Sequence, residues 1–278
     1  MKSTVLLVVI FALTVSVAAQ EGIRLVDFKN FTYEAFCAGE QTQNVKVKDG
    51  EFSYEKQMDG YTDRLYFTVS DIAYGDLDGD RSDDAIVLTV CNGGGTGNFS
   101  EGLVYKWKDG KPILIANIPG GDRAYGGLKS VKVANSVAVV ERYDAGEHGA
   151  ACCPEYILTE RYKLQGGKMI QIGKSARKEI YPKERVLFDK GTAGKTLKVK
   201  VPSGDRKRFV VGAKAGQRLT VSAGMTTANI RLLESDDARV TEGVNNFLAV
   251  LSKTRDYTIE VSNSSDAEIE VTLTVKID

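Results

Sequence analysis

Apolar and polar residues alternate in short runs along most of the chain, and helical periodicity is almost absent after the N-terminal apolar segment. Runs of this kind, bounded by glycine, asparagine and aspartate, are typical of β-strands. Clear examples are RLYFTVS at 64–70, AIVLTV at 85–90 and GLVYKW at 102–107. The pattern predicts an all-β protein with many tight turns.

Turn residues between consecutive runs predict three β-hairpins. KDGK at 108–111 leads into the strand PILIANI, and an Asp-Gly pair is a strong hairpin signal. A second hairpin turns at Asn135 and Ser136, and a third turns at QGGK, residues 165–168. Because sequential strands joined by short turns pair with each other, these hairpins predict antiparallel sheets.

A charged stretch with one proline, KSARKEIYPKE, interrupts the strand pattern. We therefore predict a linker at 175–183, which separates an antiparallel β-rich domain at 20–174 from a second domain at 184–278. The second domain contains about seven short, regularly spaced runs, which predicts a jelly-roll-like β-sandwich. Its run TLKVKV alternates polar and apolar residues as a half-buried strand requires.

Residues 1–19 predict an export signal. Lys2 precedes an apolar run at 4–15 that is too short to span a bilayer, and cleavage is expected after Ala19. An uncleaved anchor is the alternative. No later run is long enough to cross a membrane, so we expect a periplasmic or secreted protein that is not membrane-embedded. The 37 basic and 37 acidic residues give no positive excess, which argues against a nucleic-acid partner.

Four cysteines in an oxidising compartment predict two disulfides. Adjacent cysteines rarely bond each other, because the small ring strains the peptide. Cys152 and Cys153 are therefore expected to bond separately to Cys37 and Cys91, in either pairing. A vicinal bridge and a thiolate metal site are the alternatives, although zinc would require a fuller Cys/His set.

The stretch GDLDGDRSDD, at 75–84, places acidic side chains at alternate positions of a tight loop. Such side chains turn toward one centre and offer the hard oxygen atoms that calcium prefers. The predicted ligands are the carboxylates of Asp76, Asp78, Asp80 and Asp84 and the carbonyl of Ser82. We expect a structural calcium ion there, and Asp83, which is out of step, is expected to point away. The alternative is a metal-free turn whose aspartates accept hydrogen bonds from backbone amides.

Three further stretches contain residues with possible functional chemistry. GDRKRF, at 204–209, gathers Arg206, Lys207 and Arg208 in a loop that attracts an anionic partner, unless it is simply solvated. The glycine-rich run at 91–102 is followed by a strand rather than a helix, so it is not a phosphate-binding loop. His148 is the only histidine, so any triad or Cys-His mechanism would require it. We assign no catalytic residue.

The first domain, at about 26–174, resembles the exported bacterial LppP/LprE-like family. The resemblance lies in DFKNFTY, GDLDGDRSDDAIVL, GGGTGNF and CCPE followed by YKLQGGK. It implies an exported location and a fold type more than an activity. The acidic loop is also similar to the calcium-binding hairpins of FG-GAP repeats, except that Arg81 stands where those hairpins have glycine.

The second domain resembles the periplasmic inhibitors of g-type lysozyme and the related pre-peptidase C-terminal sandwiches. The resemblance lies in VLFDKGTAGKTLKVKV, RFVVGAKAGQRLTVSA and DYTIEV. Such inhibitors insert a tyrosine-bearing loop and nearby arginines into the enzyme. In this chain the corresponding loop carries Arg206 and Lys207, and the late loop at 262–270 has no arginine.

These features together predict an exported, non-enzymatic binding protein of the cell envelope. Its sandwich would recognise a protein, a lysozyme among the candidates, or a glycan. One alternative is an inhibitor of g-type lysozyme, and another is an envelope hydrolase.

Overall fold

The computed structural model describes residues 22–37, 43–147, 149–224 and 227–278. The predicted export signal and His148 lie outside these ranges. Contacts between Cα atoms divide the chain into two units, Met1–Arg177 and Lys178–Asp278. This division falls inside the segment 175–183 that the sequence marked as a linker.

The described residues form strands, turns and two short 3-10 helices, without an α-helix, which confirms the predicted all-β class. None of the helical segments in these ranges is long and apolar enough to cross a bilayer.

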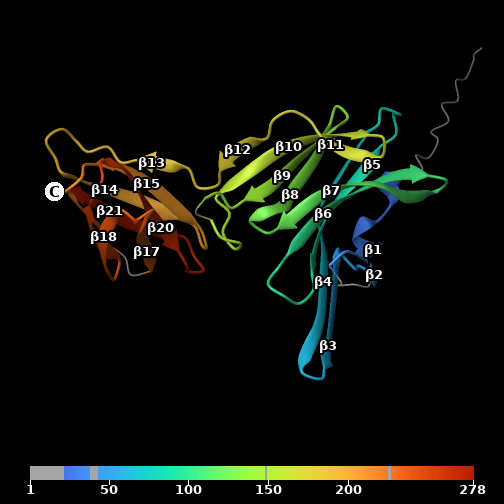
Figure 1. The fold of residues 1–278 in the computed structure, drawn as a ribbon, viewed down its shortest axis with the longest axis horizontal. Helices are drawn as coiled ribbons and strands as arrows, with labels where there is room; N and C mark the ends of the chain where they lie inside the picture. Colours follow the sequence, from blue (N-terminus) through green and yellow to red (C-terminus); the bar gives the residue numbers. More distant parts are fainter. Residues whose placement is uncertain (1–21, 38–42, 148, 225–226) are drawn as a thin grey trace, which may run out of the picture. The chain divides into compact units, whose positions relative to one another are not determined.

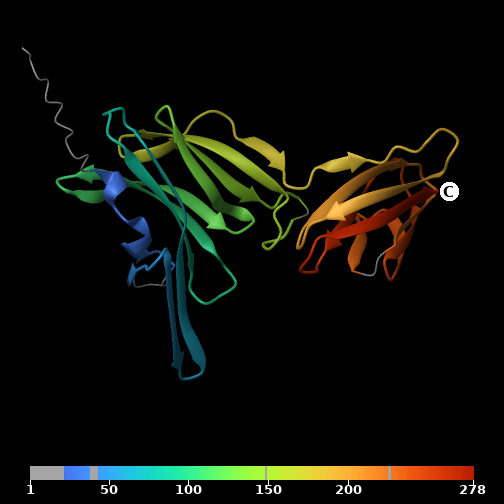
Figure 2. The same cartoon turned by 180° about the vertical axis from the view of Figure 1, so that it is seen from behind.

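Unit 1 is built on one sheet that is antiparallel from β3 to β11, with consecutive strands as neighbours (Figure 1). A tenth strand of this sheet, β12, pairs with β10 and spans the division between the two units. The strands are β3 (Glu51–Met58), β4 (Tyr61–Gly75), β5 (Asp84–Asn92), β6 (Phe99–Lys108), β7 (Lys111–Asp122), β8 (Tyr125–Ala134), β9 (Val137–Asp144), β10 (Tyr156–Gln165), β11 (Lys168–Gln171) and β12 (Ala176–Glu179). The far end of the β3–β4 hairpin extends beyond the other strands of this unit (Figures 1 and 2).

The three predicted hairpins are confirmed as β6–β7, β8–β9 and β10–β11. In the first, Asp109 and Gly110 have φ values of 53° and 75°, and in the second Asn135 and Ser136 have values of 52° and 56°. Two successive positive φ angles form the turn whose twist matches that of paired strands. The local turn residues therefore specified these hairpins correctly.

The long sheet folds over on itself between β7 and β8. These two strands share only the residue pair Asp122–Tyr125, so the ladder is nearly interrupted there. Beyond this point β8 lies against β4, and the backbone N–H of Val131 donates to a carboxylate oxygen of Asp71 at 2.8 Å. Buried apolar side chains, among them Ile86, Leu88 and Ile118, fill the space inside the fold.

The outer face of β4–β6 is covered by the N-terminal segment of the described chain, comprising η1 (Ile23–Leu25), η2 (Phe28–Asn30), β1 (Thr32–Ala35) and β2 (Gln43–Lys46). Aromatic rings fill this second core, where Phe31 packs edge-on against Tyr33 and Tyr105 with ring centroids 5.1 and 5.6 Å apart. The Tyr33 hydroxyl donates to the Phe28 carbonyl at 2.5 Å, so its one polar atom is paired.

Unit 2 is a sandwich of a four-stranded and a five-stranded sheet around one apolar core, as the sequence predicted. The four-stranded sheet has the order β13-β15-β20-β17, and the other has the order β14-β21-β16-β19-β18. The strands are β13 (Lys183–Arg185), β14 (Gly194–Val201), β15 (Arg206–Ala213), β16 (Arg218–Ala223), β17 (Ala228–Leu233), β18 (Ala238–Gly243), β19 (Asn246–Leu251), β20 (Arg255–Asn263) and β21 (Ile269–Ile277). In β21 the odd-numbered residues from Ile269 to Ile277 are buried.

The predicted cysteine pairing is wrong. Cys37 bonds Cys91, and Cys152 bonds its neighbour Cys153, which was the stated alternative. Cys37 follows β1 on the covered face of the sheet, where buried Cys91 on β5 lies with a Cα–Cα distance of 5.7 Å. Cys152 and Cys153 lie between β9 and β10, in a loop that the fold does not bring to that face. Topology therefore decided the pairing.

Candidate functional site

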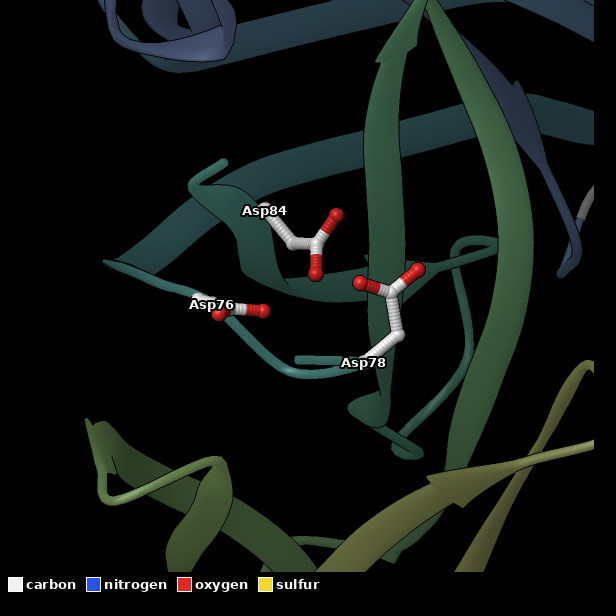
Figure 3. Close-up of side chains that lie close together, drawn as sticks. All are labelled: Asp76, Asp78 and Asp84. Carbon is white, nitrogen blue, oxygen red and sulfur yellow. The ribbon is translucent and has the colours of Figure 1, made fainter. Parts of the chain in front are cut away.

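The acidic loop connects β4 to β5 and gathers three of its carboxylates. Asp76, Asp78 and Asp84 each offer an oxygen atom, and these atoms lie within 4.8 Å of one another. The three side chains point toward a common space between the loop and the start of β5 (Figure 3). The predicted convergence of alternate positions is thus present for these three residues.

Backbone amides hold the loop in shape. The two carboxylate oxygens of Asp76 accept from the N–H groups of Gly79 and Arg81 at 2.6 and 2.9 Å. Asp80 accepts from the N–H of Ser82 at 2.7 Å. Arg81 adopts a φ of 71°, the left-handed conformation that a glycine would take without strain. The loop therefore contains the hydrogen bonds from backbone amides to aspartates that were expected for the metal-free alternative.

Asp84 is the buried member of the group. It is 1% exposed, and its Oδ2 atom accepts from the N–H of Leu77 at 3.0 Å. Its Oδ1 atom is also buried and has no hydrogen-bond partner within the described ranges. Burial raises the pKa of this carboxyl to about 6, because a low dielectric disfavours the ionised form. A cation near Oδ1 would satisfy this atom.

A lysine from the neighbouring strand faces the same loop. The Lys106 ammonium group contacts Asp78 and lies 2.8 Å from a carboxylate oxygen of Asp80. The hydrogen bonds that Lys106 donates to Asp78 and then to Asp80 raise the pKa of Lys106, and the lysine in turn lowers the pKa of Asp80. Asp80 is therefore turned to Lys106 rather than to the cluster of three.

Sequence reasoning missed Lys106 because it lies twenty-two residues beyond Asp84 and reaches the loop only through the β5–β6 register, which places it opposite Asp84. Ser82, a predicted carbonyl ligand, is positioned by the bond from its N–H group to Asp80. Asp83 pairs with Arg24, in keeping with the expectation that it points away from the cluster.

An arginine cluster occupies the outer face of the four-stranded sheet in unit 2. The cluster consists of Arg206, Arg208, Arg231 and Glu260. Strand register places Arg208 and Arg231 on either side of Glu260 on the central strand β20. Arg208 donates through Nε and Nη2 to one oxygen of Glu260, at 3.0 and 2.9 Å. Arg231 donates in the same way to the other oxygen, at 2.9 and 2.7 Å.

Burial differs strongly within the arginine cluster. The side chains of Glu260 and Arg208 are 1% and 5% exposed, whereas those of Arg206 and Arg231 are 21% and 54% exposed. Tyr181 covers the buried part, because its ring centroid lies 4.9 Å from the guanidinium carbon of Arg206 and 5.3 Å from that of Arg208. Stacking of this kind stabilises a partly desolvated guanidinium group.

Three guanidinium groups of the arginine cluster, those of Arg206, Arg208 and Arg231, lie around the carboxylate of Glu260. Arg206 Nη1 lies 3.7 Å from Glu260, and its buried Nε has no hydrogen-bond partner among the described residues. A pocket of 350 Å³ opens beside it, lined by residues 180–184 and 205–209, which include the acidic residues Glu184 and Asp205. Lys207 is exposed on the other side of β15, because side chains alternate along a strand.

The sequence identified two of the four residues in the arginine cluster, Arg206 and Arg208, but the prediction that they lie in a loop is wrong, because β15 begins at Arg206. Arg231 and Glu260 lie on β17 and β20, which the sandwich topology places beside β15. The available signal was Glu260 itself, an acidic residue inside the apolar run YTIEV, because a buried charge requires a partner. Tyr181 gave no sequence signal.

No protein-family model and no curated protein matches this chain. Solved structures of periplasmic inhibitors of g-type lysozyme do match part of it. The Aeromonas hydrophila inhibitor is 23% identical with a TM-score of 0.30, and the match covers 34% of this chain and 96% of the inhibitor. The Salmonella Typhimurium inhibitor is 17% identical and a mutant of the Escherichia coli inhibitor 15%, each with a TM-score of 0.28 and coverage of 34% and 97%.

Proposed function

We propose that this chain is an exported, non-enzymatic binding protein of the cell envelope, which recognises an anionic group of a protein or glycan through the arginine cluster. The observation that supports this proposal is the gathering of three guanidinium groups around the buried carboxylate of Glu260.

The charge arrangement favours an anionic ligand. Glu260 accepts from both Arg208 and Arg231, so it compensates part of the positive charge and holds the side chains in place. Arg206 retains donor capacity beside the 350 Å³ pocket, in a position that is partly shielded from water. Guanidinium groups fixed in this way bind carboxylate or phosphate oxygens in pairs, and partial burial weakens screening by salt.

The test is binding of purified mature protein to a panel of envelope glycans and proteins, each anionic member matched with a neutral one. Arg206→Gln is expected to weaken binding to the anionic members about ten-fold, as the loss of one charge-assisted contact predicts. Lys198→Gln, which removes an exposed cation on β14, serves as the matched control. Equal affinity for anionic and neutral members would refute the proposal.

The lysozyme alternative is tested with the same proteins. Because the second domain resembles inhibitors of g-type lysozyme in sequence, g-type lysozyme is the first protein of the panel, with its turnover measured at micromolar concentrations of the chain. If the wild-type chain inhibits g-type lysozyme and Arg206→Gln reduces this inhibition, the lysozyme is the partner. If the wild-type chain leaves the turnover of the lysozyme unaltered, the alternative is dismissed. Steady product release from glycan or ester substrates by the pure protein would instead support an envelope hydrolase.

We also propose that the acidic loop binds a structural calcium ion through Asp76, Asp78 and Asp84. The three converging carboxylates and the unpartnered Oδ1 atom of Asp84 fit a hard divalent cation. When bound, the ion would crosslink the β4–β5 loop to the start of β5. Lys106 is a competing cation for Asp78, so its removal is expected to strengthen calcium binding.

Calorimetric titration of chelator-treated protein with calcium tests this site. Asp84→Asn is expected to abolish the heat of binding and the calcium-dependent rise in melting temperature, and Lys106→Gln is expected to increase the affinity. Asp83→Asn is the matched control, because Asp83 pairs with Arg24 outside the cluster. A flat titration for the wild type would exclude the ion.

A further inference from the structure

A second pocket, in unit 1, lies on the face of β6 and β7 that the described residues of the N-terminal segment only partly cover. Its volume is 600 Å³, which is within the range of sites for small organic ligands. The pocket is lined by Glu34, Phe36, Glu101, Leu103, Tyr105, Leu114, Ile115, Ala116 and Asn117. No sequence motif marks these residues, and none belongs to the arginine cluster or to the acidic loop.

The β6–β7 hairpin builds the floor and one wall. Leu103 and Tyr105 alternate along the same face of β6, opposite Asn117 and Leu114 of β7. The register shifts between Val104 and Tyr105, which leaves one extra residue on β7, Ile115. A bulge of this kind bends its strand and redirects side chains, and the extra residue, Ile115, lines the pocket.

The opposite wall comes from the end of β1. Phe36 directly precedes Cys37, and the disulfide from Cys37 to Cys91 anchors this segment to β5. Phe36 is 40% exposed and Leu114 is 51% exposed, whereas Leu103 and Tyr105 on the floor are 6% exposed. Apolar surface is therefore presented on both walls of a hollow whose position the disulfide fixes.

The charge in the pocket is of one sign. Glu34 and Glu101 contribute carboxylates, and the lining residues, all of them in the described ranges, include no lysine, arginine or histidine. One oxygen of Glu101 accepts from the Asn117 side-chain amide at 2.7 Å, which orients the carboxylate. Burial and then the charge of Glu101 raise the pKa of Tyr105, so its phenol remains a neutral group at the floor.

We propose that this pocket binds a small organic cation with an apolar body, an aryl- or alkyl-ammonium or guanidinium compound. The apolar body would contact Phe36, Leu103 and Leu114, and the cationic head would lie against Glu101 and Glu34. An anion of the same shape would meet two carboxylates and no counter-charge. The proposal is independent of the anion-binding function proposed for unit 2.

Isothermal titration of the mature, full-length protein with phenylpropylamine and with phenylpropionate tests this proposal, because the two probes differ mainly in the sign of their charge. The amine is expected to bind saturably and the carboxylate is not. Glu101→Gln preserves the shape of the side chain and is expected to weaken the amine about ten-fold or more, as the loss of one charge-assisted contact predicts.

Two further variants make the outcome decisive. Glu51→Gln, which removes an exposed carboxylate of β3 away from the pocket, is expected to leave the affinity unchanged. Glu34→Gln is measured as well, so that a conclusion remains possible if thermal denaturation shows that Glu101→Gln is poorly folded. Equal binding of both probes, or equal effects of the Glu51 and Glu101 variants, would overturn the proposal.

Discussion

Replacing Glu260 by glutamine tests whether the arginine cluster is held together by one buried charge. The wild-type carboxylate accepts four N–H groups, two from Arg208 and two from Arg231, and is 1% exposed. Glutamine retains the shape and one oxygen acceptor, but its amide group would face a guanidinium group. Arg208, at 5% exposed, would then lose the charge of Glu260 beside it.

The expected loss follows from burial. Breaking a buried ion pair by removing one partner costs about 3–5 kcal/mol, and the oxygen that glutamine keeps places Glu260→Gln near 3 kcal/mol. Arg231 is 54% exposed, so water replaces its contacts, and Arg231→Gln is expected to cost about 1 kcal/mol or less. The order of the two effects matters more than their absolute values.

Urea denaturation of the full-length variants measures these losses, and hydrogen exchange of the β20 amides assigns the affected transition to unit 2. Glu270→Gln, on an exposed position of β21, is the control and is expected to have little effect. Equal losses for Glu260→Gln and Arg231→Gln, or a loss below about 1 kcal/mol for Glu260→Gln, would refute the buried-charge explanation.

Two further predictions concern the covalent and electrostatic constraints. Replacing both Cys37 and Cys91 by serine opens a loop with a sequence separation of 54, so the loss of unfolding free energy is expected to be about 4 kcal/mol in chemical denaturation. The double serine variant of Cys152 and Cys153 opens no long loop and should lose much less; similar losses would contradict this reasoning. Hydrogen bonds from Arg255 lower the pKa of Asp237, so the stability that this pair provides is present above the ordinary aspartate pKa and is lost as the pH falls through the lowered value. Denaturation midpoints measured from neutral to acidic pH should fall less for Asp237→Asn than for the wild type.

Residues of the candidate sites could be predicted from the sequence when they lie close together along the chain, and could not be predicted when they lie far apart. The convergence of Asp76, Asp78 and Asp84 was predictable, because alternate positions in one tight loop face one centre. Lys106 was not, since it reaches the loop through the register of two strands. Arg208 was visible as part of a basic stretch, but its partner Glu260 lies fifty-two residues away and meets it only across the β15–β20 ladder.

The sequence by itself determined the secondary structure, because alternation of apolar and polar residues and the conformations allowed at turns such as Asp109-Gly110 are local properties. It also determined that unit 2 is a sandwich, since most of its strands have an apolar face to bury. Tertiary structure alone decided that Cys37 bonds Cys91 and that β1 leaves a pocket over β6 and β7. These features depend on which surfaces the folded sheet brings together, and no local pattern encodes that choice.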